Sequence, residues 1–287
     1  MSNLLNSQAA VLAFALAASI ALCTWIASVA RRDASIVDSV WSLMIFAAVI
    51  GYAFFTTGGP RMIWLLPLVG LWAARLCAHI TWRNHGQPED RRYQAIRARN
   101  QPRYALKSLY LVFGLQAVLA WIVALPVMAS VAAPEPHSAL DALGAAIVVF
   151  GLIYESIADG QLARFRASPR SAGQVMNSGL WRYSRHPNYF GECCVWWGFW
   201  LIALAGGAAW TVISPLLMTW LLLKISGVTL LEQGMAARRP AYAEYVRRTN
   251  AFFPGPRRAL GPLDTQSVPS DDRVATAATG LCGESKP

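Results

Sequence analysis

Long apolar runs constrain this chain more than any other feature of its sequence. Seven runs are long enough to cross ~30 Å of hydrocarbon, which takes roughly 20 helical residues. Only 14% of the 287 residues are charged, whereas soluble domains carry roughly 25%. The sequence therefore predicts an all-α membrane protein with seven transmembrane helices. The runs lie near residues 8–30, 36–56, 62–82, 109–133, 138–158, 190–206 and 208–230.

The distribution of Lys and Arg predicts how these helices are oriented. Loops between seven helices alternate sides, and positive residues gather on the cytoplasmic side. Of the 25 Lys and Arg residues, 22 fall on one side, and Arg61 alone falls on the other. This places the N-terminus outside and the C-terminus in the cytoplasm. The membrane would be the inner membrane of a bacterium or the endoplasmic reticulum of a eukaryote.

Composition also bounds the class of protein. The net charge of +10 does not indicate nucleic-acid binding, because the arginines lie between apolar runs and not on a soluble face. The five cysteines have no paired or metal-like spacing, so no metal site is expected. We expect one membrane domain over 1–262, a mobile tail over 263–287, and a monomer surrounded by membrane lipid.

The segment 179–192 is the most informative polar stretch. Pro187 suits a first helical turn, which puts Asn188 and Glu192 one turn apart on one helix face. Helix N-termini attract anions, so a phosphate or another polar ligand is expected there. An interfacial helix start with snorkelling arginines would look similar. Other candidate side chains of this segment are Tyr183, Arg185 and His186.

Three other segments carry candidate binding residues. At the end of the fifth run, two carboxylates and two arginines could bind an adenine-ribose-phosphate group or form a salt-bridged helix end. The 83–108 loop offers arginines, an acid and a tyrosine, although an amphipathic helix on anionic lipid would look alike. The third segment follows the last run. These residues are Glu155, Asp159, Arg164 and Arg166; Arg83, Asp90, Arg91 and Tyr93; and Arg238, Tyr242 and Tyr245.

Few ionisable residues lie inside the apolar runs. A charge in the bilayer costs at least ~2.5–3.5 kcal/mol on insertion scales, so each is a functional candidate. Asp38 lies three residues before Trp41, and Arg75 could pair with it. No Walker loop and no Gly-x-Gly-x-x-Gly after a strand is present, so any nucleotide must bind without a Rossmann domain.

Three motifs together resemble a bacterial branch of the steroid 5-alpha-reductase family. They are Arg-His-Pro-Asn-Tyr-Phe-Gly-Glu (185–192), Glu-Asp-Arg-Arg-Tyr (89–93), and Leu-Glu (231–232) followed by Arg-Pro-Ala-Tyr-Ala-Glu-Tyr (239–245). The resemblance covers about 36–257. It implies a seven-helix enzyme whose cytoplasmic loops close over NADPH. A lipid-side cavity between the first helices would admit a 3-oxo-4-ene steroid.

The resemblance assigns several roles. The family's cofactor pattern matches Glu155, Asp159, Arg166, Asn188 and Glu192, and the 83–93 region matches its other cofactor loop. The animal enzymes carry a Gln-Glu pair and a Tyr where this chain has Val37-Asp38 and Trp72. The later His and Tyr are replaced at Gly234 and Arg238.

These assignments lead to an expected reaction. Hydride transfer to the β-carbon of a conjugated ketone puts negative charge on the carbonyl oxygen. We expect a protonated Asp38 to donate to that oxygen, with Trp41 shaping the cavity.

A second resemblance suggests another cofactor. The Arg-His-Pro-x-Tyr-x-Gly run is also similar to isoprenylcysteine carboxyl methyltransferases, which bind S-adenosylmethionine. Arginine-rich loops favour NADPH, because S-adenosylmethionine has no phosphate. A non-catalytic transporter or lipid-binding protein would need more polar residues along a transmembrane path.

Overall fold

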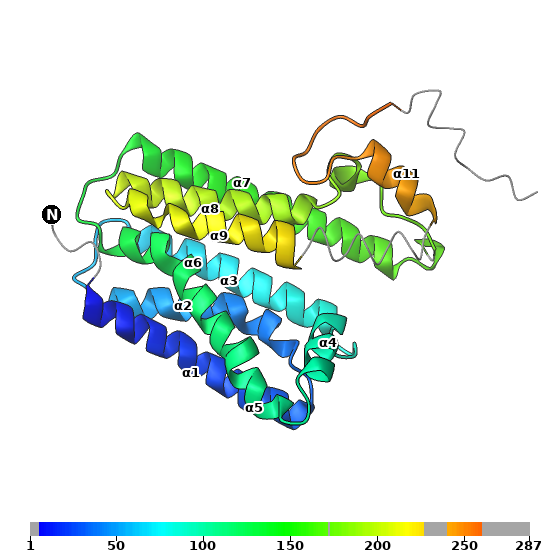
Figure 1. The fold of residues 1–287 in the computed structure, drawn as a ribbon. Helices are drawn as coiled ribbons and strands as arrows, with labels where there is room; N and C mark the ends of the chain where they lie inside the picture. The colour runs from blue at the N-terminus through cyan, green and yellow to red at the C-terminus, as the bar shows by residue number, and fades with distance from the viewer. Residues whose placement is uncertain (1–5, 172, 227–239, 260–287) are drawn as a thin grey trace, which may run out of the picture.

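The structure is a computed structural model that describes residues 6–171, 173–226 and 240–259. Apart from connecting segments and an isolated bridge between Ser184 and Asn250, the described residues are helical. The long helices run side by side, with α1, α2, α3 and α6 on one side of the bundle and α7, α8 and α9 on the other (Figure 1). They are α1 (Ser7–Arg31), α2 (Ile36–Phe54), α3 (Met62–Asn84), α6 (Leu115–Ala132), α7 (Ala139–Ala167), α8 (Pro187–Ala205) and α9 (Ile213–Trp220).

Shorter helical segments connect or extend the long ones. α4 and α5 form within the arginine-rich connection between α3 and α6, and α11 follows near the C-terminal end of the described chain. Two π-helical turns precede α6 and follow α9. The bounds are α4 (Arg91–Arg99), α5 (Tyr104–Ser108), the π-helical turns Leu109–Gly114 and Leu221–Ser226, the 3-10 turns Pro169–Ser171, Gly179–Arg182 and Ala209–Val212, and α11 (Pro240–Arg248).

The helices coincide with the seven apolar runs, and five of them qualify as candidate membrane spans. Among the described residues, five helices are long and apolar enough to cross a membrane, and Ala209–Lys224 is a shorter apolar helix. α8 is not among the five because Asn188, Glu192 and its tryptophans lower its hydropathy. The protein is thus an integral membrane protein with five candidate spans. They are Ser7–Arg31, Ile36–Phe54, Met62–Asn84, Tyr104–Ala132 and Ala139–Ala167.

One boundary agrees with the sequence and one differs. α8 begins at Pro187 in the first helical turn, as predicted. α7 continues to Ala167, past the expected end at 158, because its polar last turns project beyond the apolar part of the bundle. The last run, 208–230, is helical as far as Ser226. The tail over 263–287 lies outside the described residues.

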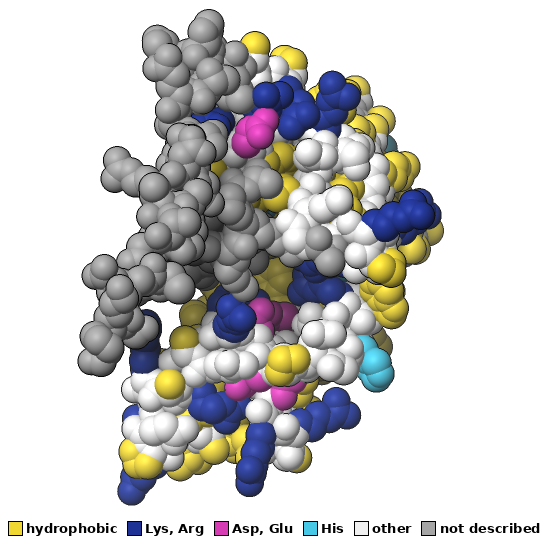
Figure 2. Space-filling view, turned by 90° about the vertical axis from the view of Figure 1, so that its right-hand side faces the viewer, with side chains coloured by type: hydrophobic (Ala, Val, Ile, Leu, Met, Phe, Trp, Pro, Cys, Tyr) yellow, Lys and Arg dark blue, Asp and Glu magenta, His cyan; other side chains and the backbone are white. Residues whose placement is uncertain are grey.

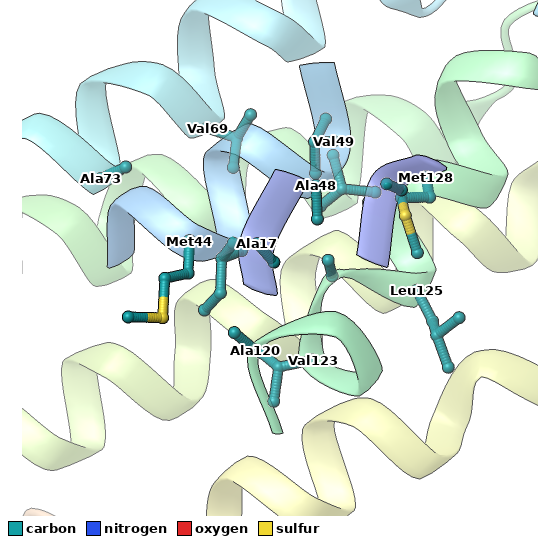
Figure 3. Packing of buried hydrophobic residues seen from close by; sticks show 14 of the residues in the cluster. Ala17, Met44, Ala48, Val49, Val69, Ala73, Ala120, Val123, Leu125 and Met128 are labelled. Atoms are coloured by element: carbon teal, nitrogen blue, oxygen red, sulfur yellow. The ribbon is translucent and has the colours of Figure 1, made fainter. Parts of the chain in front are cut away.

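Small residues allow the helices to pack closely, as is common in membranes. α7 and α8 meet through glycines seven residues apart on each helix. A Cβ on Gly151 would lie 2.6 Å from the carbonyl oxygen of Gly191, and one on Gly198 would lie 2.7 Å from that of Gly144. This contact holds the polar residues of α7 and α8 together. Figure 3 shows the apolar core formed by α1, α2, α3 and α6.

Charged side chains gather at one end of the bundle. The connections 32–35, 84–103 and 168–186 lie at that end, together with α4 and α11 (Figure 1). Figure 2 looks at this end and shows many Lys and Arg side chains, with some Asp and Glu side chains among them. At the opposite end, Arg61 is completely buried and forms a two-pronged ion pair with Asp141, with N···O distances of 2.6 and 2.9 Å.

Candidate functional site

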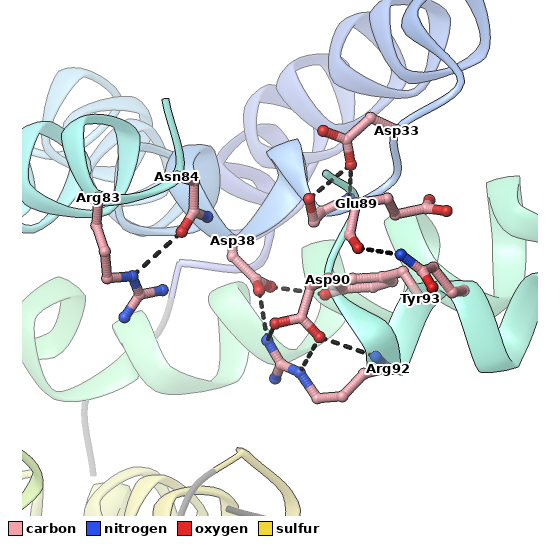
Figure 4. Close-up of polar contacts among 10 residues, drawn as sticks. Asp33, Asp38, Arg83, Asn84, Glu89, Asp90, Arg92 and Tyr93 are labelled. Carbon is pink, nitrogen blue, oxygen red and sulfur yellow. Dashed lines mark hydrogen bonds and ion pairs between the residues drawn. The ribbon is translucent and has the colours of Figure 1, made fainter. Parts of the chain in front are cut away.

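The first polar group, the α2–α4 cluster, consists of Asp38, Asp90, Arg92 and Tyr93 (Figure 4). The Tyr93 hydroxyl donates to Oδ1 of Asp38 at 2.6 Å, and Nη2 of Arg92 donates to Oδ2 at 2.8 Å. Asp90 caps α4 by accepting from the backbone N–H of Arg92 at 2.8 Å. Both oxygens of Asp38 are therefore occupied by residues of α4.

A second contact fixes α4 over the turn between α1 and α2. Oε1 of Glu89 accepts from the backbone N–H of Ala34 at 2.8 Å and from Nη2 of Arg97 at 2.7 Å. Arg97 also donates to the carbonyl oxygen of Arg32 at 3.1 Å and lies 4.5 Å above the Tyr104 ring. These bonds determine where α4 presents Arg92 and Tyr93.

The α4 side chains have perturbed ionisation. Burial and the neighbouring Asp38 carboxylate raise the pKa of Tyr93 well above its ordinary value, so its hydroxyl keeps its proton. Burial also tends to raise the pKa of Asp90, but the hydrogen bonds and charge of Arg92 outweigh it and the net pKa is lowered. The α2–α4 cluster thus holds a neutral phenol beside an anionic Asp90.

The partner of Asp38 differs from the expected one. Arg92 pairs with Asp38, whereas Arg75 lies in another cluster. A carboxylate held by a guanidinium accepts hydrogen bonds and does not donate them. The pair with Arg92 therefore argues against Asp38 as the proton-bearing donor. Trp41 donates to the carbonyl oxygen of Gln116 at 3.2 Å. Arg91 is exposed.

The second group, the α3–α7–α8 cluster, joins the predicted cofactor residues of α7 and α8 to α3. Arg75 pairs with Glu155 at 2.6 Å and with Asp159 at 3.1 Å. His79 lies 3.6 Å from Asp159, and the Asn188 amide donates to the same carboxylate at 3.2 Å. Glu155 and Asp159 are thus salt-bridged, though to Arg75 of another helix and not to arginines of α7.

Glu192 completes the α3–α7–α8 cluster from α8. Its two carboxylate oxygens accept one indole N–H each, from Trp72 and from Trp196, both at 2.9 Å. The two indole rings meet edge to face with centroids 5.0 Å apart, and Glu192 is buried. This carboxylate, which the sequence left without a structural partner, is therefore fixed by two tryptophans.

Two hollows adjoin the α3–α7–α8 cluster. A polar pocket of about 340 Å³ is lined by Arg75, His79, Trp82, Ser156, Asp159, Gly160, Ala163 and Arg164. An almost entirely apolar groove of about 670 Å³ is lined by Leu43, Ala74, Cys77, Ala78, Thr81, Trp82 and His85. Trp82 lines both, so a charged pocket and an apolar groove meet on α3. Both volumes fall within the ~300–1,000 Å³ usual for small-molecule sites.

Two arginines near the polar pocket have no ion pair within the part of the chain that the structure describes. Arg164 is exposed, and Arg83 donates only to its neighbour Asn84, at 3.1 Å. Neither forms an ion pair with a carboxylate of the described residues. Arg83 is also an electrostatic neighbour of both Asp38 and His79, so it links the two clusters. Arg166 acts electrostatically on His79 as well.

The remaining predicted residues hold the C-terminal segment on the start of α8. Arg185 donates to the carbonyl oxygens of Val246 and Thr249 at 3.0 and 2.8 Å. Tyr245 donates to that of Trp181 at 2.6 Å. These contacts give the two side chains a structural role.

The other residues of this region lie close by. The backbone carbonyl of Tyr183 accepts from Gly255, and buried His186 stacks on Tyr189 with ring centroids 5.5 Å apart. Tyr242 packs against Tyr245. Arg238 lies outside the described residues.

The comparisons with known proteins assign a family. Residues 24–249 match the family described as "Protein of unknown function (DUF1295)". The chain belongs to the DUF1295 family. A Schizosaccharomyces pombe relative, "Uncharacterized protein C594.04c", is 24% identical over 261 residues, which cover 80% of this chain and 75% of the yeast protein. No solved structure matches this DUF1295 chain. The family description and the yeast protein's name state no activity.

Sequence reasoning marked Arg75 and His79 as functional candidates inside the apolar runs, but it did not include them, Trp72 or Arg92 among the cofactor-binding residues. Trp72, Arg75 and His79 recur at helical spacing and mark one face of α3, a signal that was present in the sequence. Arg92 carried no comparable signal, because it is one of several arginines in its loop. Only the docking of α4 distinguishes Arg92 from exposed Arg91.

Proposed function

We propose that this protein is an NADPH-dependent reductase of the C=C bond of a conjugated ketone, with a 3-oxo-4-ene steroid as the first substrate to test. The observation that carries the proposal is the charged pocket and the apolar groove meeting at Trp82. A polar cofactor would need the charged pocket, and a lipophilic substrate from the bilayer would need the apolar groove beside it. The motif resemblance supplies the reaction class.

The residues present fit a phosphate-bearing nucleotide. Arg83 and Arg164 would hold phosphate, since guanidinium groups recognise it well and neither is ion-paired with a described carboxylate. The polar pocket also adjoins buried Glu155, whose Oε2 has no hydrogen-bond partner among the described residues. Buried unpartnered polar atoms are costly, so a ligand amide or hydroxyl donor would stabilise this one. Asp159 and Asn188 would hold the same part of the cofactor.

The α2–α4 cluster suits the carbonyl end of the substrate. NADPH would supply a hydride to the β-carbon, and a proton from water would add at the α-carbon. The carbonyl oxygen becomes more negative and needs a hydrogen-bond donor. When substrate binds, the Tyr93 hydroxyl would give up its hydrogen bond to Asp38 and donate its one proton to the carbonyl oxygen, while Arg92 stays paired with Asp38. The donor is thus Tyr93, with Asp38 as its positioning residue.

A second candidate is an S-adenosylmethionine-dependent methyltransferase. The α3–α7–α8 cluster sets three carboxylates, Glu155, Asp159 and Glu192, around the single guanidinium of Arg75. A sulfonium cation is favoured by such an excess of negative charge. The arginines beside the pocket would find no phosphate in that cofactor, and this favours NADPH.

We further propose that the chain spans the membrane seven times, with its N-terminus outside and its charged end in the cytoplasm. α8 and the Ala209–Lys224 helix pack alongside the five candidate spans, and the arginine-rich connections share one end. Positive residues favour the cytoplasmic side. The membrane would be the bacterial inner membrane or the endoplasmic reticulum.

Nucleotide titration tests the proposed cofactor. Purified protein in detergent is titrated with NADPH, NADH and S-adenosylmethionine, and binding is followed by calorimetry. We expect NADPH to bind at least about tenfold more tightly than NADH, because charge-assisted bonds to the 2′-phosphate are lost in NADH. Equal affinities, or tight binding of S-adenosylmethionine alone, would refute the reductase proposal.

A further inference from the structure

We infer that the carboxylates of the α3–α7–α8 cluster stabilise the positive charge that forms on the nicotinamide ring, and that the protein consequently binds NADP⁺ more tightly than NADPH. This inference rests on the proposed function and assigns a role to Glu155, Asp159 and Glu192 within it. Hydride loss leaves the nicotinamide ring one unit more positive. A pocket with surplus negative charge therefore favours the oxidised form.

The charge balance of the cluster supports this inference. Among the described residues, three carboxylates face one guanidinium, that of Arg75. It pairs with Glu155 at 2.6 Å and with Asp159 at 3.1 Å and is an electrostatic neighbour of Glu192. His79 is the other basic group, 3.6 Å from Asp159. Even with His79 protonated, the formal negative charges exceed the positive ones by one.

The charge surplus is buried, which strengthens its effect. Glu155, Asp159 and Glu192 are each 4–6% exposed. Charges interact more strongly where water is excluded. Arg83 acts electrostatically on His79 from the charged end, but it contacts none of the three carboxylates in the described hydrogen bonds and ion pairs.

An incomplete hydrogen-bond shell points to a ligand at this cluster. Oε2 of Glu155 is buried without a hydrogen-bond partner among the described residues, and so is Nε of Arg75. By contrast, both oxygens of Glu192 are satisfied by indole N–H groups. Glu155 is therefore the carboxylate with an oxygen left open to a ligand, and its charge should contribute to the preference for NADP⁺.

The test measures two dissociation constants in each of three proteins: wild type, Glu155→Gln and Glu244→Gln. Gln keeps the shape of Glu and removes the charge. Glu244 is half-exposed on α11, where it pairs with Arg248, so it controls for the loss of one negative charge elsewhere. NADP⁺ and NADPH are titrated into each protein in detergent, and thermal unfolding confirms that each variant is folded.

We expect wild type and Glu244→Gln to favour NADP⁺ over NADPH by at least about tenfold. Glu155→Gln should reduce this preference by about tenfold, as expected for one charge ~10 Å away at an effective dielectric constant of ~20. An unchanged ratio in a folded Glu155→Gln protein, or a wild type that binds both forms equally, overturns the inference while the reductase proposal stands. Failure of wild type to bind either nucleotide refutes the proposed function itself.

Discussion

Tyr93 of α4 donates a 2.6 Å hydrogen bond to Asp38 of α2, so a surface helix completes a polar site that begins inside a membrane helix. Arg92 holds the other oxygen of Asp38 at 2.8 Å. Because the carboxylate is already paired, the phenol is the protonated group of this cluster. The relationship predicts that the two residues act as a unit.

Tyr93→Phe should lower kcat with a conjugated ketone by roughly 10²–10³, the usual cost of losing one oxyanion donor. Asp38→Leu should have a similar effect, and the double variant should be little worse than either, because each single change disables the same donor. Asp38→Asn keeps an acceptor for the phenol and should retain partial activity. Steady-state kinetics check all four variants.

Tyr104→Phe is the matched control. The Tyr104 hydroxyl is buried without a hydrogen-bond partner among the described residues, so its removal should leave activity unchanged. Full activity in both Tyr93→Phe and Asp38→Leu would show that this cluster only fixes α4.

Arg164→Ala should weaken NADPH binding while leaving NADH binding nearly unchanged, because the lost guanidinium serves the 2′-phosphate. Arg83→Ala tests the same role from α3. Arg170→Ala, an exposed change in the 3-10 turn that follows α7, is the control. If NADPH and NADH weaken equally in all three variants, these arginines supply only general positive charge.

Glu192→Gln should destabilise the protein by about 1–3 kcal/mol, the usual cost of a buried group left without its partner. Two indole N–H groups donate to Glu192, one to each carboxylate oxygen. A Gln side chain can accept only one of them on its oxygen, and its NH₂ group, itself a donor, would face the other indole N–H. Thermal unfolding in detergent measures the change. Asn188→Ala should instead lose cofactor affinity with little change in stability. A Glu192→Gln protein as stable as wild type would contradict the two-indole arrangement.

Gly151→Ala should destabilise the α7 and α8 contact by about 1–3 kcal/mol through overpacking, because the new Cβ would meet the Gly191 carbonyl oxygen at 2.6 Å. Gly160→Ala is the control on the same helix, where a Cβ meets nothing within 4 Å. That change should be neutral, or stabilising by up to about 1 kcal/mol. Equal melting temperatures for the two variants would argue against close packing at Gly151.

Apolar periodicity located the helices because burial in lipid needs long apolar runs, and Pro187 marked the start of α8 because proline suits a first turn. Spacing of four residues placed Glu155 with Asp159, and Asn188 with Glu192, on single helix faces. The partners across helices could not be predicted. Arg75 is the intramembrane cation nearest to Asp38 in sequence, yet in the folded protein it pairs with Glu155 and Asp159 of α7. The docking of α4 likewise selects Arg92 over Arg91.

Transfer of deuterium from C4-deuterated NADPH to a 3-oxo-4-ene steroid tests the central claim most directly. Protein in detergent or lipid is incubated with both compounds, and the product is analysed by mass spectrometry and NMR. The account predicts a saturated ketone with one deuterium on the former β-carbon. It also predicts that this product is strongly reduced in Tyr93→Phe. A protein that binds NADPH but transfers no deuterium to any conjugated ketone, or that instead transfers a methyl group from S-adenosylmethionine, would contradict the account.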